Sequence, residues 1–116
     1  MSERTSAQRT REPLRSCIER CSDCHDVCTE AIAGFLQGSN PHGQYLLVRL
    51  LSDCAQLCDT TRDFMLRSSD LYRQIAGLCA ELCERCAQAC ERQGSELLVR
   101  CAEECRRCAE SCRAVA

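Results

Sequence analysis

The sequence is dominated by a twelve-residue pattern that places four cysteines at steps of four, three and four. The pattern occurs as CIERCSDCHDVC at 17–28, CAELCERCAQAC at 79–90 and CAEECRRCAESC at 101–112. At about 100° per residue, this spacing puts the four cysteines of a window within roughly 60° of arc on one helix face. Each window therefore predicts a helix with a stripe of thiols along one side.

A fourth, incomplete copy indicates a fourth helix of the same kind. The window CAQLCDTTRDFM at 54–65 keeps the first two cysteines and has Thr61 and Met65 in the positions of the third and fourth. The stripes continue into apolar residues such as Leu14 and Leu51, which is typical of seam positions in a helical bundle. Four equivalent elements predict an all-α fold, an antiparallel four-helix bundle with a cysteine-lined core.

Residues that favour helix ends define the expected boundaries. Pro13 suits the first turn of a helix, and turn-forming residues follow at 38–41. Residues 68–70 can end the second helix and cap the third, and residues 94–95 can end the third and cap the fourth. Connections this short force neighbouring helices to run antiparallel. We expect a flexible N-terminal segment at 1–12 and a bundle over 13–116, with helices at about 13–37, 41–67, 70–93 and 95–115.

Composition limits the size of the core and the kinds of partner. A chain of 116 residues forms one domain, and with fourteen cysteines, two Phe, two Tyr and no Trp its interior must be largely sulfur. The net charge of −2 comes from interspersed charges of both signs, which predicts no nucleic-acid partner and no membrane surface. The sequence has no signal-like or membrane-spanning apolar run, so we expect a cytoplasmic protein.

Several non-metal or cluster functions are alternatives for these cysteines. Cysteine can simply pack a seam, although Leu, Ile and Ala do so better. Disulfides are disfavoured in a reducing cytosol, and a bridge within one helix has poor geometry. Pairs such as Cys21 and Cys24 have the C-x-x-C spacing of thiol redox proteins, but no βαβ pattern surrounds them. Ferredoxin-like iron–sulfur sites use loop cysteines with spacings that are absent here.

Binding of a soft metal ion explains the stripes better. Zn(II) takes four thiolates in a tetrahedron, so fourteen cysteines could supply three sites with two left over. Cu(I) accepts few ligands and lets one sulfur bridge several ions, which suits continuous stripes. We therefore expect multiple Cu(I) ions, with Zn(II) as the alternative. The expected ligands are Cys17, Cys21, Cys24, Cys28, Cys54, Cys58, Cys79, Cys83, Cys86, Cys90, Cys101, Cys105, Cys108 and Cys112.

Met65 and the two histidines are other side chains of a type that binds soft metal ions. Met65 extends the helix 2 stripe, and its thioether is either a soft, labile ligand where copper enters or a core residue that fills a gap. His25 lies just off its stripe and is either an auxiliary ligand or a solvated, helix-packing histidine. His42 falls in the first turn of the second helix, where we expect it at the surface.

The cysteine windows, together with Cys54 and Cys58, resemble those of the cytosolic copper storage proteins, bacterial four-helix bundles with cysteine-lined cores. The resemblance covers the chain from about residue 13 to its end. It implies a homotetramer that holds many Cu(I) ions inside each bundle and takes them up at one end, without catalysis. It also implies a role in storing or detoxifying copper, with a copper chaperone or a cuproenzyme as partner. The helix expected at 41–67 has only two cysteines, and Thr61 interrupts its stripe. We therefore expect this chain to bind fewer copper ions than relatives with more cysteines.

Overall fold

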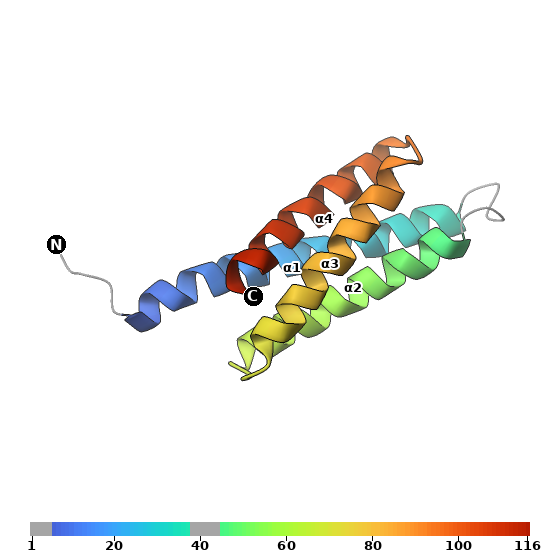
Figure 1. Cartoon of the computed structure of the whole chain (residues 1–116). Helices are drawn as coiled ribbons and strands as arrows, with labels where there is room; N and C mark the ends of the chain where they lie inside the picture. The colour runs from blue at the N-terminus through green and yellow to red at the C-terminus, as the bar shows by residue number, and fades with distance from the viewer. Residues whose placement is uncertain (1–5, 38–44) are drawn as a thin grey trace.

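The computed structural model describes residues 6–37 and 45–116, which form an antiparallel four-helix bundle (Figure 1). The helices are α1 (Ser6–Leu36), α2 (Tyr45–Leu66), α3 (Tyr72–Glu91) and α4 (Glu96–Val115). α1 and α3 each pack against α2 and α4, so the pairs α1/α3 and α2/α4 lie on the diagonals. The predicted fold class is confirmed. None of the described helices has a stretch long and apolar enough to cross a membrane.

The first helix begins earlier than expected. α1 starts at Ser6 instead of residue 13, so Pro13 lies inside the helix and most of the segment expected to be flexible is helical. The proline removes one backbone hydrogen bond, but its fixed φ is compatible with an α-helix. The first turns of α1 extend past the end of α4 (Figure 1). The expected start of the second helix at 41 and the position of His42 lie outside the described residues.

The turn between α2 and α3 differs from the prediction in its capping. Ser68 has a φ of 56°, and its N–H donates to the Met65 carbonyl at 3.1 Å while Ser69 N–H donates to the Phe64 carbonyl at 2.9 Å. This is the Schellman pattern, with serine where glycine is usual. No side chain caps α3, because Ser69 Oγ accepts the N–H of Leu71 at 3.1 Å within the turn itself. The expectation that residues 68–70 cap this helix was therefore wrong.

The turn between α3 and α4 follows the prediction. Gly94 has a φ of 70°, which is the left-handed conformation that favours glycine. Ser95 is the N-cap of α4, and its Oγ accepts the N–H of Leu98 at 3.2 Å. Because this hairpin is tight, the ends of the α3 and α4 stripes are held side by side.

The core is made of sulfur and small side chains. All fourteen cysteines are fully buried as free thiols, together with alanines, three leucines and Met65. Thr61 is the only buried polar side chain among the described residues, and its Oγ1 donates to the Leu57 carbonyl at 2.7 Å, so its hydroxyl is satisfied within its own helix. The cysteine-lined core predicted from the stripes is confirmed.

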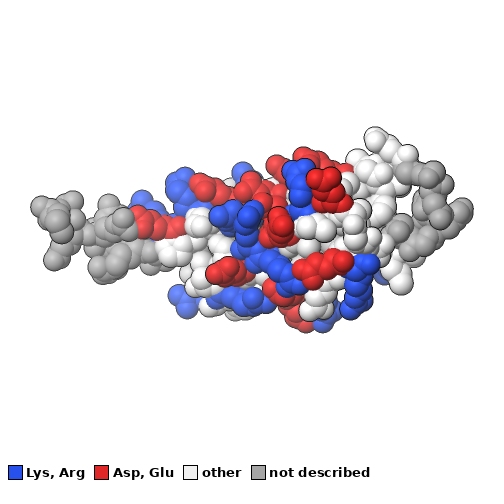
Figure 2. Space-filling model, turned by 90° about the horizontal axis from the view of Figure 1, so that it is seen from above, with Lys and Arg blue, Asp and Glu red and all other residues white. Residues whose placement is uncertain are grey.

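The outer surface mixes charges of both signs. Figure 2 shows arginine and acidic side chains interspersed along the middle of one face of the bundle. Arg106 joins α4 to α3 through Glu84 at 3.0 Å and Glu91 at 2.7 Å. Exposed ion pairs contribute only about 0.2–1 kcal/mol each to stability, so these pairs add little to the packing of α4 against α3.

Candidate metal centre

The fourteen thiols form one connected column along the bundle axis. Twelve of the Sγ atoms lie 3.5–4.0 Å from at least one other sulfur, and together these contacts form a single network. Cys86 lies within 4.8 Å of Cys28, Cys101 and Cys105. Cys90 completes the column, with Cys101 and Cys86 as its neighbours. Four separate segments of sequence thus build one sulfur-lined interior.

The sulfur contacts and the 1.5 Å rise of a helix sort the core into layers across the bundle. We call the end where α2 and α4 finish the Met65 end, and the opposite end the Leu47 end. The first layer at the Met65 end, here called the outer layer, contains Cys17 and Cys112 with Thr61 and Ala76. Two complete layers follow, Cys21, Cys58, Cys79 and Cys108, then Cys24, Cys54, Cys83 and Cys105. The last two contain Cys28, Cys86 and Cys101 with Leu51, then Cys90 with Ala31, Leu47 and Leu98.

The two ends of the column are closed by different side chains. At the Leu47 end, three leucines and Ala31 take the missing thiol positions, and each leucine is at most 6% exposed. At the Met65 end, the small residues Thr61 and Ala76 take the corresponding places. Beyond them lie buried Met65 and the partly exposed Leu14 and Tyr72. The Met65 end is therefore the more lightly closed of the two.

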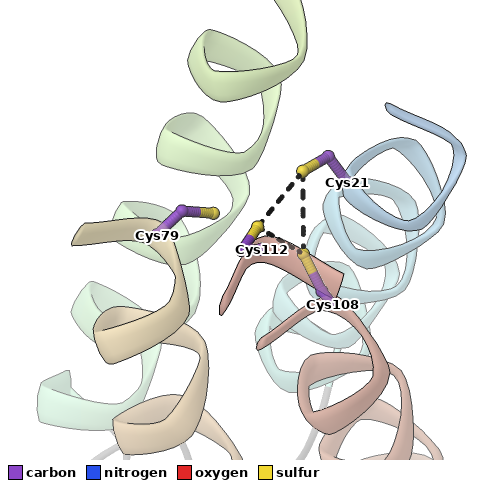
Figure 3. A group of neighbouring side chains, drawn as sticks. All are labelled: Cys21, Cys79, Cys108 and Cys112. Atoms are coloured by element: carbon purple, nitrogen blue, oxygen red, sulfur yellow. Dashed lines mark hydrogen bonds between the residues drawn. The ribbon is translucent and has the colours of Figure 1, made fainter. Parts of the chain in front are cut away.

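The column contains four groups of four sulfurs that lie within 4.8 Å of one another. In the group nearest the Met65 end, drawn in Figure 3, Cys79 from α3 points toward Cys21 from α1 and the α4 pair Cys108 and Cys112. The groups overlap, because Cys24, Cys28, Cys105 and Cys108 each belong to two of them. At most two groups can therefore close around separate ions at once.

This overlap corrects the expectation that the cysteines could supply three independent tetrahedral sites. With metal–sulfur bonds of about 2.3 Å, sulfurs lie about 3.8 Å apart around a tetrahedral ion and about 4.0 Å apart around a trigonal one. The observed contacts of 3.5–4.0 Å suit both geometries. The sharing of sulfurs distinguishes the two metals. A closed zinc site does not need a shared sulfur, whereas a Cu(I) cluster with bridging thiolates does.

Comparison with known proteins agrees with this chemistry. The sequence matches the copper storage protein family over residues 10–116. The chain belongs to the copper storage protein family. It is 33% identical to the Cu(I)-bound copper storage protein BsCsp3, of Bacillus subtilis, with a TM-score of 0.86 over 90% of this chain and 98% of that one.

Two further relatives show the range of the family. Ccsp from Streptomyces lividans, loaded with 10 copper equivalents, is 29% identical, with a TM-score of 0.86 over 90% of this chain and 84% of that chain. The uncharacterized cysteine-rich protein YhjQ of Bacillus subtilis is 34% identical over 69 residues, which is 60% of this chain and 64% of that protein. The bundle described here is thus shared with proteins that carry Cu(I).

Met65 and His25, the two side chains considered as additional metal ligands, lie in different surroundings. Met65 is 3% exposed and belongs to the same core as the thiols, as its place in the stripe predicts. His25 is not part of any of the four sulfur groups. Its side chain is 36% exposed, its Nδ1 lies 3.0 Å from Asp26 Oδ1, and it lines a surface groove beside α2 with Asp59. The structure does not bring His25 to the thiol column of this copper storage protein.

A hollow at the Met65 end is a feature that the cysteine pattern alone does not reveal. It has a volume of about 220 Å³ and lies against the beginnings of α1 and α3 and the end of α4, at Pro13, Leu14, Tyr72, Arg73 and 114–116. Leu14 and Val115 continue the stripes one turn beyond Cys17 and Cys112, so the hollow lies over the end of the column. Extending each stripe by one turn would have identified it.

Hydrogen bonding and burial set the proton affinity of the thiols. Hydrogen bonds from Cys112 and Cys21 lower the pKa of Cys17 to about 4, against burial, which raises it. For most of the others the pKa is raised, because the thiol donates to a neighbouring sulfur and because burial disfavours the thiolate. Those with a raised pKa are Cys21, Cys28, Cys58, Cys83, Cys86, Cys90, Cys105 and Cys112.

These raised pKa values predict that the reduced, copper-free bundle loses stability in alkali. Above the ordinary cysteine pKa of 9.0 the unfolded chain ionises while these thiols in the folded state keep their protons. The folded state then binds more protons, so the free energy of unfolding falls by about 1.4 kcal/mol per pH unit for each such thiol. Anaerobic denaturant unfolding at about pH 9.5 and about pH 11 measures this. In this range the thiols whose pKa is lowered are ionised in both states and contribute little; they are Cys17, Cys24, Cys54, Cys79, Cys101 and Cys108. A free energy of unfolding that stays constant or rises over this range would contradict the raised pKa values.

Proposed function

We propose that this copper storage protein holds many Cu(I) ions through the thiolates of its fourteen cysteines. The observation that carries the proposal is the continuous column, in which neighbouring groups of sulfurs share members. Cu(I) prefers soft thiolate ligands and low coordination numbers, and a thiolate can bridge two ions. A column with shared sulfurs therefore accommodates a chain of copper ions better than a set of isolated sites.

Charge balance supports a high capacity. Burying fourteen unpaired thiolates would be prohibitively costly, so the empty core must be largely protonated. Each Cu⁺ that binds replaces a thiol proton and offsets the charge of one thiolate, so loading releases protons and leaves the interior close to neutral. Near one ion per thiol the charges cancel.

The arrangement favours storage over catalysis. Every cysteine is fully buried, so a bound ion would have no open position that faces solvent or a substrate. We propose that the protein works in the cytosol, where it limits free copper and holds the metal for cuproenzymes. The related protein from Streptomyces lividans is described as cytosolic, which supports this location.

We also propose that copper enters at the Met65 end. The small residues Thr61 and Ala76 complete the outer layer there, whereas leucines take three of the missing thiol positions at the other end. The Met65 thioether lies in the core beyond the last thiols, and it is a soft, neutral ligand suited to passing Cu(I) inward. Its place between the surface and the column supports a role in transfer.

Self-association is the remaining part of the proposal. A groove of about 480 Å³ between α2 and α3 is lined by Leu57, Leu78 and Leu82, with charged residues at its rim. Leu78 is 56% exposed, although it is a large apolar residue. We propose that this face, here called the α2–α3 face, joins copies of the chain into a homotetramer.

The first prediction concerns copper capacity. Anaerobic titration of the reduced protein with Cu(I), under competition with a chelator, should give tight uptake of about one ion per thiol, with release of protons. Zn(II), titrated in parallel, should saturate at no more than two ions, because at most two of the sulfur groups are separate. Saturation with three or fewer Cu(I) ions, and zinc held as tightly, would show that the protein is a zinc-stabilised bundle instead.

The second prediction concerns Met65. Met65→Leu keeps the volume and apolar character of the side chain but removes the sulfur, so capacity should be unchanged while Cu(I) uptake and exchange slow several-fold. Leu47→Met, the converse change at the closed end, is the matched control and should alter neither. Stopped-flow mixing with a Cu(I) complex measures the rates. An unchanged rate in Met65→Leu would remove the thioether from the transfer path.

The third prediction concerns the α2–α3 face. Leu78→Glu places a charge in the apolar groove and should convert the tetramer into smaller species. Val99→Glu makes the same change at another exposed apolar residue, which is 41% exposed on α4, and should leave the assembly intact. Sedimentation velocity measures both. If Leu78→Glu remains a tetramer, self-association uses another face. If the unmodified protein is a monomer, self-association is excluded.

A further inference from the structure

The hollow at the Met65 end carries a cation beside the end of the thiol column. Arg73 lines it, and its Nε donates to the Tyr72 hydroxyl at 3.3 Å. Arg11 and Arg15 flank Pro13 and Leu14 on α1, and both are exposed. Pro13 and Leu14 themselves line the hollow. Three guanidinium groups thus belong to the turns that surround one opening.

These arginines are not neutralised by described carboxylates. In the middle of the bundle, Arg85, Arg106 and Arg107 each form an ion pair with a glutamate. Arg11, Arg15 and Arg73 form none within the described part of the chain. Two acidic residues near this end, Glu12 on α1 and Asp70 in the α2–α3 turn, do not line the hollow. Arg73 therefore presents a positive charge to a ligand in the hollow.

The opposite end carries exposed charges of both signs. Glu30, Glu91 and Glu96 are exposed there, and so are Arg92 and Arg100. What distinguishes the Met65 end is therefore the single guanidinium of Arg73 inside the hollow. Its attraction for an anion acts within about a Debye length, about 10 Å at 0.1 M salt.

Cu(I) carried by small thiols is itself an anion. Two thiolates on one Cu⁺ give the complex a charge of about −1, to which any carboxylate on the carrier adds. We propose that the hollow receives a complex in which two small thiolates, here called the carrier, hold one Cu(I), and that Arg73 binds the negative charge of the carrier. This proposal rests on the proposed function. A planar guanidinium is well suited to a carboxylate of the carrier.

The transfer is a ligand exchange without a change of oxidation state. A protein sulfur forms a bond to copper and one carrier thiolate leaves. If that protein sulfur carries a proton, the proton goes to the departing carrier thiolate; if it is already a thiolate, the carrier leaves as a thiolate. Repetition at a neighbouring cysteine releases the second carrier thiol. The adjacent thiols of Cys17 and Cys112, 3.5 Å apart in the outer layer, provide such a pair. Copper remains Cu(I), and the complex keeps its single negative charge throughout.

The test compares two carriers that differ in charge. Cu(I) is delivered as its glutathione complex, which is anionic, or as its cysteamine complex, whose amines are cationic, and uptake is followed by stopped-flow absorbance. Arg73→Glu should slow uptake from the glutathione complex by about three- to tenfold at low salt, and the effect should disappear at high salt. Uptake from the cysteamine complex should be unchanged or faster.

Two variants serve as controls. Arg73→Lys keeps the charge and should retain most of the rate, whereas Arg100→Glu makes the same charge change at an exposed, unpaired arginine on α4 toward the Leu47 end and should have no effect. Equal slowing with both carriers, equal slowing by Arg100→Glu, or no slowing by Arg73→Glu would overturn the proposal. Equilibrium capacity is measured in the same samples. If the unmodified protein does not bind copper, storage itself is refuted. This result is distinct from a failure of the Arg73 proposal, which concerns only the rate of uptake.

Discussion

The helical repeat of 3.6 residues is the constraint on which this structure depends. Cysteines spaced four, three and four apart can share one face only if the backbone is an α-helix, and four such faces can be buried only against one another. The same spacing that specifies the bundle thus also specifies the continuity of its sulfur column. In this protein the motif for folding and the motif for binding are one sequence pattern, and neither can be changed without affecting the other.

A sulfur-filled core makes the empty protein depend on its fold in an unusual way. Cysteine is small, so the interior buries less apolar surface than a core of leucines, and Leu51 and Leu98 are the largest fully buried side chains in the described part of the chain. Copper that binds the folded chain and not the unfolded one adds stability by mass action. The bundle therefore combines a modest packing energy with a large reserve of binding energy, and loading strengthens the scaffold that holds the metal.

Much of this could be predicted from sequence, because periodicity and capping are local. The four helices, the burial of all fourteen cysteines and the cap at Ser95 follow from residues close together in the chain. The start of α1 could not, because Pro13 is compatible with either a helix start or a helix interior. Nor could the sharing of Cys24, Cys28, Cys105 and Cys108 between groups, which depends on how far each helix slides along its neighbours. His25 shows the same limit, since one step off the stripe is enough to place it outside the core.

The two ends of the column differ in the residues that replace thiols, and under the proposed function this difference gives the store a direction. Each of the two central layers takes a thiol from every helix, whereas in the layers toward either end one or more helices supply a different residue. At one end the replacements are three leucines and Ala31; at the other they are Thr61 and Ala76, which fill little space and bring no charge. Since the hydroxyl of Thr61 already donates to the Leu57 carbonyl, it does not compete for copper. An ion at the outer layer is thus held by fewer sulfurs than one deeper in the column, and the gradient of coordination leads inward from the Met65 end.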